Sequence, residues 1–478
     1  MAYYHGIKTS EKASSVVTPA EVAVGITFAV GTAPVYMGEG AVNSLVFANS
    51  YAEAVAQLGY SDDWDSFSLC EVMKTHFALY GVSPVVFVNV LDPATHKTAV
   101  TSAEFTLVDG RAELPDTAIK SSLEVKATSS GDTLIEGTDY TAFYDGGKLI
   151  IEKLSGGAIT GSTVYIGYDK ADISKVNSDD VIGGIDISTG AKKGLELVNS
   201  VFSKYGIVPE LIIAPGFSDD SAVAAVMQAK ANSICGLFKG KAIIDADCKT
   251  IKKYSDVYGW KSDKNISGEN QILCWPMVSL GGVKYHLSSH IAALMAQVDS
   301  DNGGIPSESP SNKAVQADST VLADGTEVIM ELSDANVLNS RGIVTAMNFN
   351  GRFALWGNET ACFPASTDVK DYFIPVNRMF GYVAQSLILT FWSRLDSKMS
   401  RRLIDSVVDT VNIWLNGLKT AEHLLGGRIE FISDENPTTD LMAGKLKFHL
   451  YITPPSPAKE MEFTLEYDAD YVSEALGG

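Results

Sequence analysis

Residues 445–467 read KLKFHLYITPPSPAKEMEFTLEY, and this stretch determines how the rest of the chain is interpreted. It contains two runs in which apolar and polar residues alternate. A strict period of two is typical of strands that bury one face. The apolar positions are Leu446, Phe448, Leu450 and Ile452 in the first run, and Met461, Phe463, Leu465 and Tyr467 in the second. We therefore expect two strands, each of which needs a partner for its apolar face.

The link between the two runs, residues 453–459, contains Pro454, Pro455 and Pro457. Prolines fix φ and lack a donor, so this link is expected to be stiff and extended rather than a tight hairpin turn. The second run is then not expected to fold back on the first. It needs a sheet edge in the same chain or in a neighbouring copy. Strand addition between copies builds polymers, but natural proteins usually hide such edges, so the pattern leaves both options open.

Composition limits the classes of function. A chain of 478 residues is too long for one core, and we expect two to four domains. The net charge of −21 argues against binding to nucleic acid or to anionic membranes. No apolar run reaches the roughly 18 residues needed to span a bilayer, and the first residues lack the apolar core of a signal peptide. Five dispersed cysteines without a CxxC motif indicate reduced thiols in a cytoplasm.

The middle of the chain predicts an α/β domain interrupted by a β-rich insert. Strand, helix and strand follow one another over residues 209–246, which is the order of a parallel βαβ unit. We assign the α/β core to residues 21–98 plus 179–360. Between them, residues 99–178 consist of short strand patterns and turn signals such as Asp109-Gly110, which predict a small inserted β-sandwich.

The end of the chain predicts a C-terminal α+β domain over residues 361–453, flanked by a C-terminal arm, 454–478. An N-terminal arm is expected over residues 1–20. One long core-facing helix is predicted by apolar residues at steps of three or four: Ile388, Trp392, Leu395, Met399, Leu403, Val407, Val411, Trp414 and Leu418. Arg378, Arg394, Arg401 and Arg402 lie in the same region. They form either a solvated helix face or a basic patch that meets acidic surface on another subunit.

No residue set in the sequence supports catalysis or metal binding. His286 and His290 have helical spacing, but the glutamate that a zinc protease carries after the first histidine is absent, so we expect a surface or packed pair. Asp245 and Asp247 follow a predicted parallel strand, where open α/β sheets bind ligands, but carboxylates are common in such turns. Ser218 superficially resembles a nucleophile elbow, and helix capping by Ser218 or Asp219 explains it better. Neither a Walker motif nor GxGxxG is present, and we expect no cofactor and no metal.

Several short strings, in order, resemble the contractile tail sheath proteins of bacteriophages and of related contractile injection particles. They are YHGI at 4–7, PSESPSN at 306–312, LN at 338–339, GIVT at 342–345, LWGNET at 355–360, NRM at 377–379, PPSPA at 454–458 and FTLEY at 463–467. Each string is weak alone, and their order over residues 1–98 and 180–467 carries the resemblance. The insert falls outside this span, and we expect it on the outer surface of the particle.

The resemblance implies a structural, non-enzymatic role. Sheath subunits of this family stack as hexameric rings into a helical tube around an inner tail tube, and contraction drives that tube through a cell envelope. The implied partners are further copies of the chain, the inner tail tube protein, and baseplate and tail terminator proteins. Assembly in the bacterial cytoplasm is implied, with a virion tail or a bacteriocin-like particle as the destination. The core is expected to be subtilisin-like in shape, although shape does not carry catalysis.

The resemblance also implies which strands are exchanged. Terminal arms of neighbouring copies would add strands to the sheet of the C-terminal domain. The donated residues would be Tyr4 and Ile7 at the N-terminus and Met461, Phe463, Leu465 and Tyr467 at the C-terminus. The receiving strand would carry Leu446, Phe448, Leu450 and Ile452.

Two rival interpretations remain from the sequence. One is a cytoplasmic α/β hydrolase with a β accessory domain, which would need a catalytic constellation. The other is a tail-tube or surface-layer protein that also polymerises. Such proteins are usually β-dominated, and the βαβ pattern at 209–246 argues against this second alternative.

Overall fold

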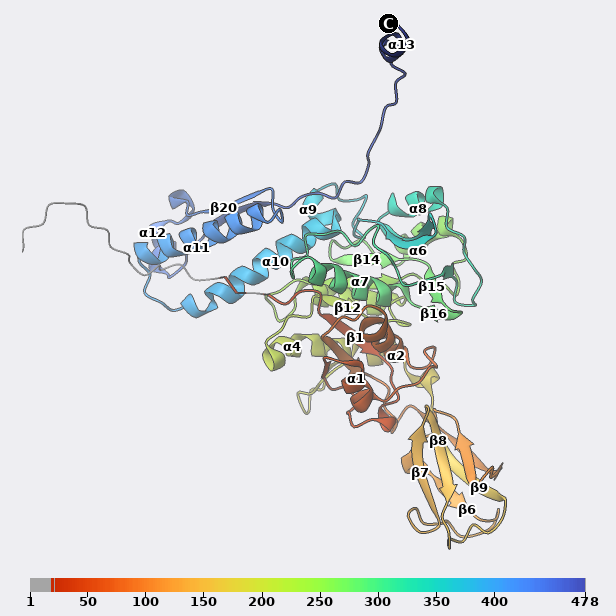
Figure 1. The fold of residues 1–478 in the computed structure, drawn as a ribbon. Helices are drawn as coiled ribbons and strands as arrows, with labels where there is room; N and C mark the ends of the chain where they lie inside the picture. Colours follow the sequence, from red (N-terminus) through yellow and green to blue (C-terminus); the bar gives the residue numbers. More distant parts are fainter. Residues whose placement is uncertain (1–18, 21, 478) are drawn as a thin grey trace, which may run out of the picture.

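The structure is a computed structural model that describes residues 19, 20 and 22–477. Figure 1 shows a central α/β body, a β-rich module at its lower end, a helical C-terminal region beside it, and an extended segment that projects beyond the body. The expectation of a mixed α/β multidomain fold is confirmed. The N-terminal positions Tyr4 and Ile7 lie outside the described residues.

An eight-stranded sheet forms the centre of the body. Its order is β19 (Arg352–Trp356), β18 (Ile343–Phe349), β14 (Gln271–Cys274), β13 (Lys241–Asp245), β12 (Leu211–Ile213), β1 (Thr27–Gly31), β3 (Val85–Asn89) and β2 (Val46–Ala48). The six inner strands pair in parallel, whereas β2 and β19 at the edges are antiparallel. Strands such as β3 are buried along their whole length, as expected for a sheet that is covered on both sides.

Helices cover both faces of this sheet. Side chains of α4 (Val198–Tyr205), α5 (Ser221–Asn232), α6 (Tyr254–Asp263) and α8 (Leu332–Asn339) join one apolar core with Phe28 and Ile212. Side chains of α1 (Tyr51–Leu58), α2 (Ser68–Met73) and α7 (Leu287–Asp301) join a second core with Ala29 and Ile213. Successive strand residues therefore contribute to opposite cores, which follows from the period of two.

The β-rich module spans β4 to β9. One three-stranded sheet contains β4 (Lys97–Thr106), β9 (Thr163–Ala171) and β6 (Glu124–Lys126), and the other contains β5 (Arg111–Leu114), β8 (Lys148–Lys153) and β7 (Tyr140–Asp145). The two sheets share one apolar core, which includes Leu149 and Ile166. The chain enters and leaves at adjacent points, since Lys97 pairs with Ala171 and Asp172 N donates to His96 O at 2.9 Å.

Several further elements are short. They are α3 (Ser178–Ile182), β10 (Gly184–Ile185), β11 (Lys192–Lys193), β15 (Met277–Leu280), β16 (Val283–Tyr285), β17 (Ser319–Val321), α9 (Val369–Tyr372) and α12 (Thr438–Met442). Within the part of the chain that the structure describes, no helix combines the length and the apolar character needed to cross a bilayer.

The C-terminal region corrects the prediction of one long helix. The helix is divided into α10 (Ile374–Phe391) and α11 (Arg401–Thr420), and Ser400 caps the second by accepting from Leu403 N at 3.2 Å. In the connection between them, Trp392, Leu395 and Met399 are exposed. Two separate apolar stripes, each at helical spacing, gave the appearance of a single one.

One strand prediction also needs correction, and a second, for residues 460–467, is not tested in a single chain. The strand β21 (His449–Thr453) begins three residues later than the alternation suggests, so Leu446 and Phe448 lie before it. The side chain of Asn436 explains this start, because it donates to Lys447 O and accepts from Lys447 N at 2.8 Å each, and so occupies the groups of a strand ladder. Residues 460–467 form no strand in the single chain.

Candidate assembly surface

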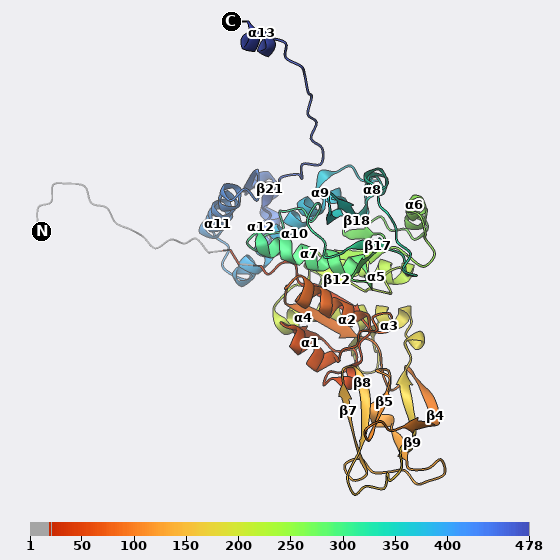
Figure 2. The ribbon, with the colours of Figure 1, turned by 45° about the vertical axis from the view of Figure 1, so that its right-hand side comes forward.

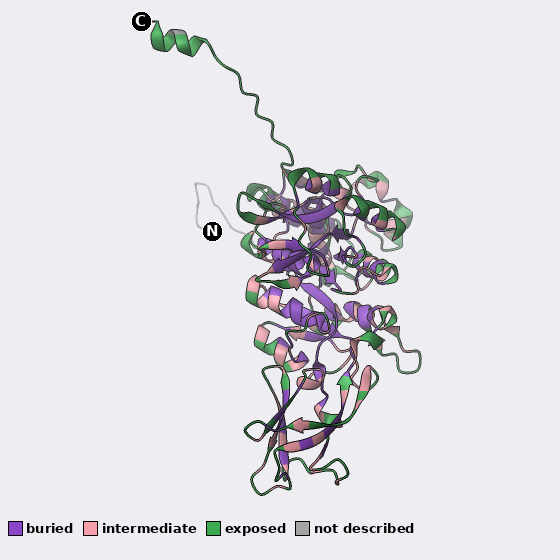
Figure 3. Ribbon diagram, turned by 90° about the vertical axis from the view of Figure 1, so that its right-hand side faces the viewer, coloured by how far each residue is buried: buried purple, intermediate pink, exposed green. Residues whose placement is uncertain are grey.

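The C-terminal arm leaves the body as an extended chain. Figure 2 shows residues beyond 459 running away from the body to a short helix, α13 (Asp470–Leu476). The apolar residues of the predicted strand are uncovered: Phe463 is 82% exposed and Leu465 is 95% exposed. Figure 3 shows the same segment as exposed along its length. A row of large apolar side chains in water marks a surface that is used for contact.

A two-stranded sheet lies in the C-terminal region. Strand β20 (Gly426–Glu430) pairs with β21 in an antiparallel ladder, and this sheet contains no other strand among the described residues. Isolated two-stranded sheets are marginal unless a further strand or a helix supports them. Here α11 covers one face, where Ile429 joins Val411 and Leu415 in a core. The outer edge of β20 is partly occupied, because the side chain of Asn412 in α11 donates to Ile429 O at 3.3 Å and accepts from Ile429 N at 3.0 Å. Among the described residues, no third strand pairs with either edge.

The predicted receiving residues only partly behave as one face. Phe448, Leu450 and Ile452 pack against the core formed by α10, α11 and β20. Leu446 is half-buried and lies outside that core. The intervening residues face outward: His449 stacks on Tyr451, and the Arg428 guanidinium lies 4.0 Å from the centre of the Tyr451 ring.

The predicted basic patch loses one member. Arg394, Arg401 and Arg402 are exposed, and Arg401 pairs with Asp405 at 2.9 Å. Arg378 is only 2% exposed, so it is not part of any surface patch. The sequence pattern could not reveal this, because the carboxylates that hold Arg378 come from distant parts of the chain.

Arg378 connects three elements inside the protein. Its Nε donates to Glu210 Oε1 at 2.6 Å and its Nη2 to Glu210 Oε2 at 2.8 Å, while Nη1 donates to Asp299 Oδ1 at 2.9 Å. Arg378 belongs to α10, Glu210 directly precedes β12, and Asp299 belongs to α7. Burial acts to raise the pKa of Glu210, but Arg378 holds this pKa below its ordinary value. The network thus fixes the first C-terminal helix to the core of the body.

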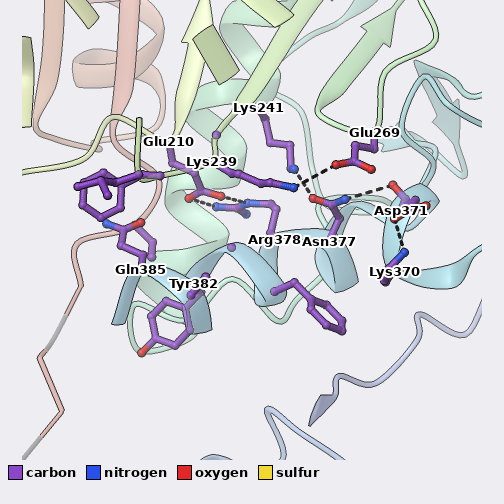
Figure 4. Close-up of a pocket in the computed structure, with 17 residues that line it drawn as sticks. Glu210, Lys239, Lys241, Glu269, Lys370, Asp371, Asn377, Arg378, Tyr382 and Gln385 are labelled. Atoms are coloured by element: carbon purple, nitrogen blue, oxygen red, sulfur yellow. Dashed lines mark hydrogen bonds and ion pairs between the residues drawn. The ribbon is translucent and has the colours of Figure 1, made fainter. Parts of the chain in front are cut away.

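A cavity of about 470 Å³ lies beside this network, at the amino ends of β12 and β13 (Figure 4). Lys241 is buried there; its ammonium donates to Asn270 Oδ1 at 2.5 Å and also to Asn377 Oδ1 of α10. Burial lowers the pKa of Lys241 to about 7. The pairing of Lys241 with Asn377 adds a second polar connection between the sheet and α10.

The root of the N-terminal segment lies against the same helix. Ala20 N donates to Thr390 Oγ1 at 2.8 Å, and Gly25 N donates to Glu210 Oε2 at 3.2 Å. Gly25 has a φ of +68°, and a Cβ there would lie 2.8 Å from Ala296 Cα, so glycine permits the close approach to α7. The chain therefore enters the body next to α10.

The carboxyl ends of the parallel strands hold a group of polar residues around Asp245. Asp245 Oδ1 accepts from Ser288 N at 2.9 Å, and Asp245 Oδ2 accepts from Ser218 Oγ at 3.3 Å. Asp220, rather than Ser218 or Asp219, caps α5, which corrects the capping prediction. Asp247 accepts from the backbone of the turn that follows it. Ser218 Oγ also accepts from Asp245 N at 3.0 Å, so both side chains belong to one buried hydrogen-bond network.

The two histidines do not form a pair. His286 Nδ1 contacts Glu71 Oε2 at 2.7 Å; burial acts to lower the pKa of His286, but Glu71 raises it to about 9. His290 is fully buried, with Nδ1 3.1 Å from the Tyr80 hydroxyl. Among the described residues, no group of three or more side chains is placed to hold a metal ion. The five cysteines are free thiols.

Some residues that connect the C-terminal region to the body could not be predicted from the sequence. Glu210 and Asp299 are separated from Arg378 by 168 and 79 positions, and no local spacing marks them. Lys459, at the base of the C-terminal arm, pairs with Glu359 at 2.6 Å. The one available signal is that Glu359 lies inside the string LWGNET, whose tryptophan and glycine suggest a buried environment.

Comparison with known proteins gives a consistent result. The chain is 30% identical to the tail sheath protein of Burkholderia phage BcepMu over 494 aligned positions, which cover all of this chain and 99% of that protein. It is 25% identical to a putative prophage major tail sheath protein of Pseudomonas aeruginosa, over 66% of this chain and 78% of that protein. No protein-family model matches the chain.

Solved structures share the fold. The sheath complex of an extracellular contractile injection system in its contracted state aligns with a TM-score of 0.58 at 14% identity, covering 98% of this chain and 99% of that chain. A chain from the baseplate of the anti-feeding prophage aligns with a TM-score of 0.58 at 13% identity, covering 98% of this chain and 100% of that one. A crystal structure of a sheath tail protein from Desulfitobacterium hafniense aligns with a TM-score of 0.51 at 10% identity, over 89% of this chain and 93% of that chain. These comparisons do not support the hydrolase alternative.

Proposed function

This chain belongs to the phage tail sheath family, and we propose that it is the repeating subunit of a contractile sheath. In this proposal it stacks as hexameric rings around an inner tail tube and contracts to drive that tube through a cell envelope. The observation that carries the proposal is the exposed, alternating strand pattern at 460–467, in a chain that also carries a two-stranded sheet. The α/β core, subtilisin-like in shape, serves as a scaffold without catalysis.

The C-terminal arm of one copy adds a strand to the β20–β21 sheet of another. Main-chain hydrogen bonds supply part of the attraction, and the apolar face supplies the rest. Burial of Met461, Phe463, Leu465 and Tyr467 would contribute about 6 to 10 kcal/mol before ordering costs. The N-terminal arm, with Tyr4 and Ile7, joins a neighbouring sheet in the same way. Leu446, Phe448, Leu450 and Ile452 form the receiving side.

Charge supports these contacts. The arm after Lys459 carries Glu460, Glu462, Glu466, Asp468, Asp470 and Glu474 and no basic residue. The exposed Arg394, Arg401 and Arg402 form a basic patch that meets acidic surface of a neighbouring copy. Such pairs steer association and select partners more than they add affinity.

The helical form of the assembly follows from the symmetry of its contacts, and contraction is a change between two packings. Contacts between identical copies that do not close on themselves generate a helix. Rigid bodies that pack in two ways of different free energy do work when they move from one packing to the other. The strand-exchanged arms hold neighbours together during this change. The further partners are the inner tail tube protein and the baseplate and tail terminator proteins, and assembly takes place in the bacterial cytoplasm, before the sheath becomes part of a virion tail or a bacteriocin-like particle.

Removal of residues 460–478 tests this function, because it deletes the donated strand and leaves the body unchanged. We expect folded, dispersed subunits in sedimentation and no tubes in negative-stain microscopy. The matched control removes only residues 468–478, which contain α13, and should still form tubes. Normal tubes from the longer truncation would contradict the proposal.

A further inference from the structure

Residues 454–459 lie along the body instead of pointing away from it, and we call this segment the strap. Pro454, its first residue, is buried. Residues 455–460 line one side of a cavity of about 800 Å³. Residues of the loop 307–313, of α8, and of the turn 356–359 line the other side. The strap therefore crosses a polar hollow with support at its two ends.

An ion pair holds the far end of the strap. Lys459 Nζ lies 2.6 Å from Glu359 Oε1, and it also lies 5.3 Å from the centre of the Phe363 ring. The Glu359 side chain is only 2% exposed, whereas that of Lys459 is 51% exposed. Among the described residues, the Lys459 ammonium is the one polar partner of Glu359 Oε1, while Glu359 Oε2 accepts from Asn358 N at 3.1 Å. A carboxylate buried this deeply needs a counter-charge.

Among the described residues, Lys459 is the last one with an ion pair or ring contact to the body. Residues 460–472 and 474–477 are all exposed. Strand β21 ends at Thr453, six residues before Lys459. An extended proline-rich chain advances about 3 Å per residue, so the strap moves the origin of the arm by roughly 18 Å from the end of β21.

We propose that the Glu359–Lys459 pair is a clamp that fixes where the C-terminal arm leaves the subunit, and hence which neighbouring copy the arm can reach. This inference rests on the proposed strand exchange. Lys459 acts here as a positioning residue, because it does not itself enter the exchanged strand. With the clamp open, the arm pivots from Thr453 and explores a larger volume. The effective concentration of the strand at the correct neighbour then falls.

Two readouts test the clamp in the full-length chain. The first is the fluorescence anisotropy of a probe on Glu462→Cys, in a background with Cys235→Ser because Cys235 is the half-buried cysteine. It is measured at a concentration where sedimentation shows dispersed chains. A probe on Glu474→Cys, near the end of the arm, gives the reference for free motion. The second readout is the critical concentration for tube formation by sedimentation.

Lys459→Met keeps the aliphatic stem and removes the charge. We expect its probe at position 462 to approach the anisotropy of the probe at 474. We expect its critical concentration to rise about tenfold, which corresponds to 1.4 kcal/mol. Lys459→Arg should behave as wild type. Lys313→Met is the matched control, since Lys313 lines the same cavity but pairs with exposed Glu308.

A double variant, Glu359→Gln with Lys459→Met, separates positioning from stability. It removes the stranded carboxylate and should restore the thermal stability of the subunit, but not the anisotropy or the critical concentration. Equal anisotropy for Lys459→Met and Lys459→Arg would overturn the clamp, and so would recovery of assembly in the double variant. Failure of wild type to polymerise would instead contradict the proposed function, and the anisotropy readout would remain valid.

Discussion

Arg378 shows how single residues connect the parts of this protein. Its guanidinium is 2% exposed and is shared by the carboxylates of Glu210 and Asp299. Burial raises the pKa of Asp299 to about 6, although Arg378 acts in the opposite direction. A buried charge is tolerated only while its partners remain. The C-terminal helices are thus held to the body by charged groups whose separation would cost several kcal/mol of free energy.

Replacement of Arg378 by methionine should destabilise the subunit. Loss of one partner from a buried ion network leaves uncompensated charge, and the expected loss is about 3–5 kcal/mol in the free energy of unfolding. Arg378→Lys should recover only part of it, because an ammonium cannot make the bidentate contacts. Denaturant unfolding of disassembled subunits measures both. A loss in the methionine variant as small as that of the exposed control Arg402→Met would contradict this role.

Buried histidines should make the subunit sensitive to acid. Burial lowers the pKa of His76 to about 4 and that of His290 to about 3. The unfolded chain binds these protons near pH 6.5 while the folded chain does not, so stability is lost as pH falls below about 6.5. The expected slope is about 1.4 kcal/mol per pH unit for each histidine.

The variant His290→Phe isolates one of these contributions. It keeps the aromatic edge contacts with Tyr80 and Tyr285 but cannot take up a proton. Its unfolding free energy should fall less steeply than that of wild type between pH 6.5 and 4. Parallel slopes for wild type and His290→Phe would rule out this explanation.

At the scale of elements, local patterns predicted much of the fold, and the failures have physical causes. The alternation over residues 445–452 predicted a strand that overlaps β21 but begins earlier, and the βαβ order at 209–246 predicted β12, α5 and β13. The helix break at 392–400 was missed because apolar residues continue through it at helical spacing, although Trp392 and Leu395 are exposed. Helix periodicity reports spacing and not burial, so it cannot separate these cases.

The candidate surface was predicted only where it is local in sequence. The arm and its exposed apolar face could be predicted from residues 461–467 alone. The burial of Arg378 and the contact of Lys459 with Glu359 depend on partners at least 79 positions away. The sequence alone does not show which distant residues lie close together in the fold. A buried charged residue therefore cannot be distinguished from an exposed one.

The inserted β module should be removable. Its entry and exit are adjacent, and it has its own core, so a short Gly-Ser linker in place of residues 97–171 should span the gap. The body would lose the contact of the Tyr36 hydroxyl with Asp116 O at 2.7 Å and the ring contact with Tyr144. We expect soluble subunits that form tubes of normal appearance in negative-stain microscopy. Insoluble product would mean that the module is part of the folding core.

At the scale of the whole molecule, the inserted β module and the C-terminal arm are far apart. Figure 1 shows the inserted module and the C-terminal arm at opposite ends of the body. The β20–β21 sheet and the start of the described chain both lie near α10 or α11. Contacts between copies through one end leave the other end free to face outward. This arrangement supports the proposal that the chain is an assembly subunit whose inserted module faces the outside of the particle.

The most direct test of this account is a cryo-EM map of tubes assembled from the full-length chain. We predict density for residues 460–467 of one copy as a strand beside the β20–β21 sheet of another copy, with Phe463 and Leu465 buried between them. A map in which Phe463 and Leu465 pack against their own chain, or in which the arm makes no contact with any neighbour, would contradict it.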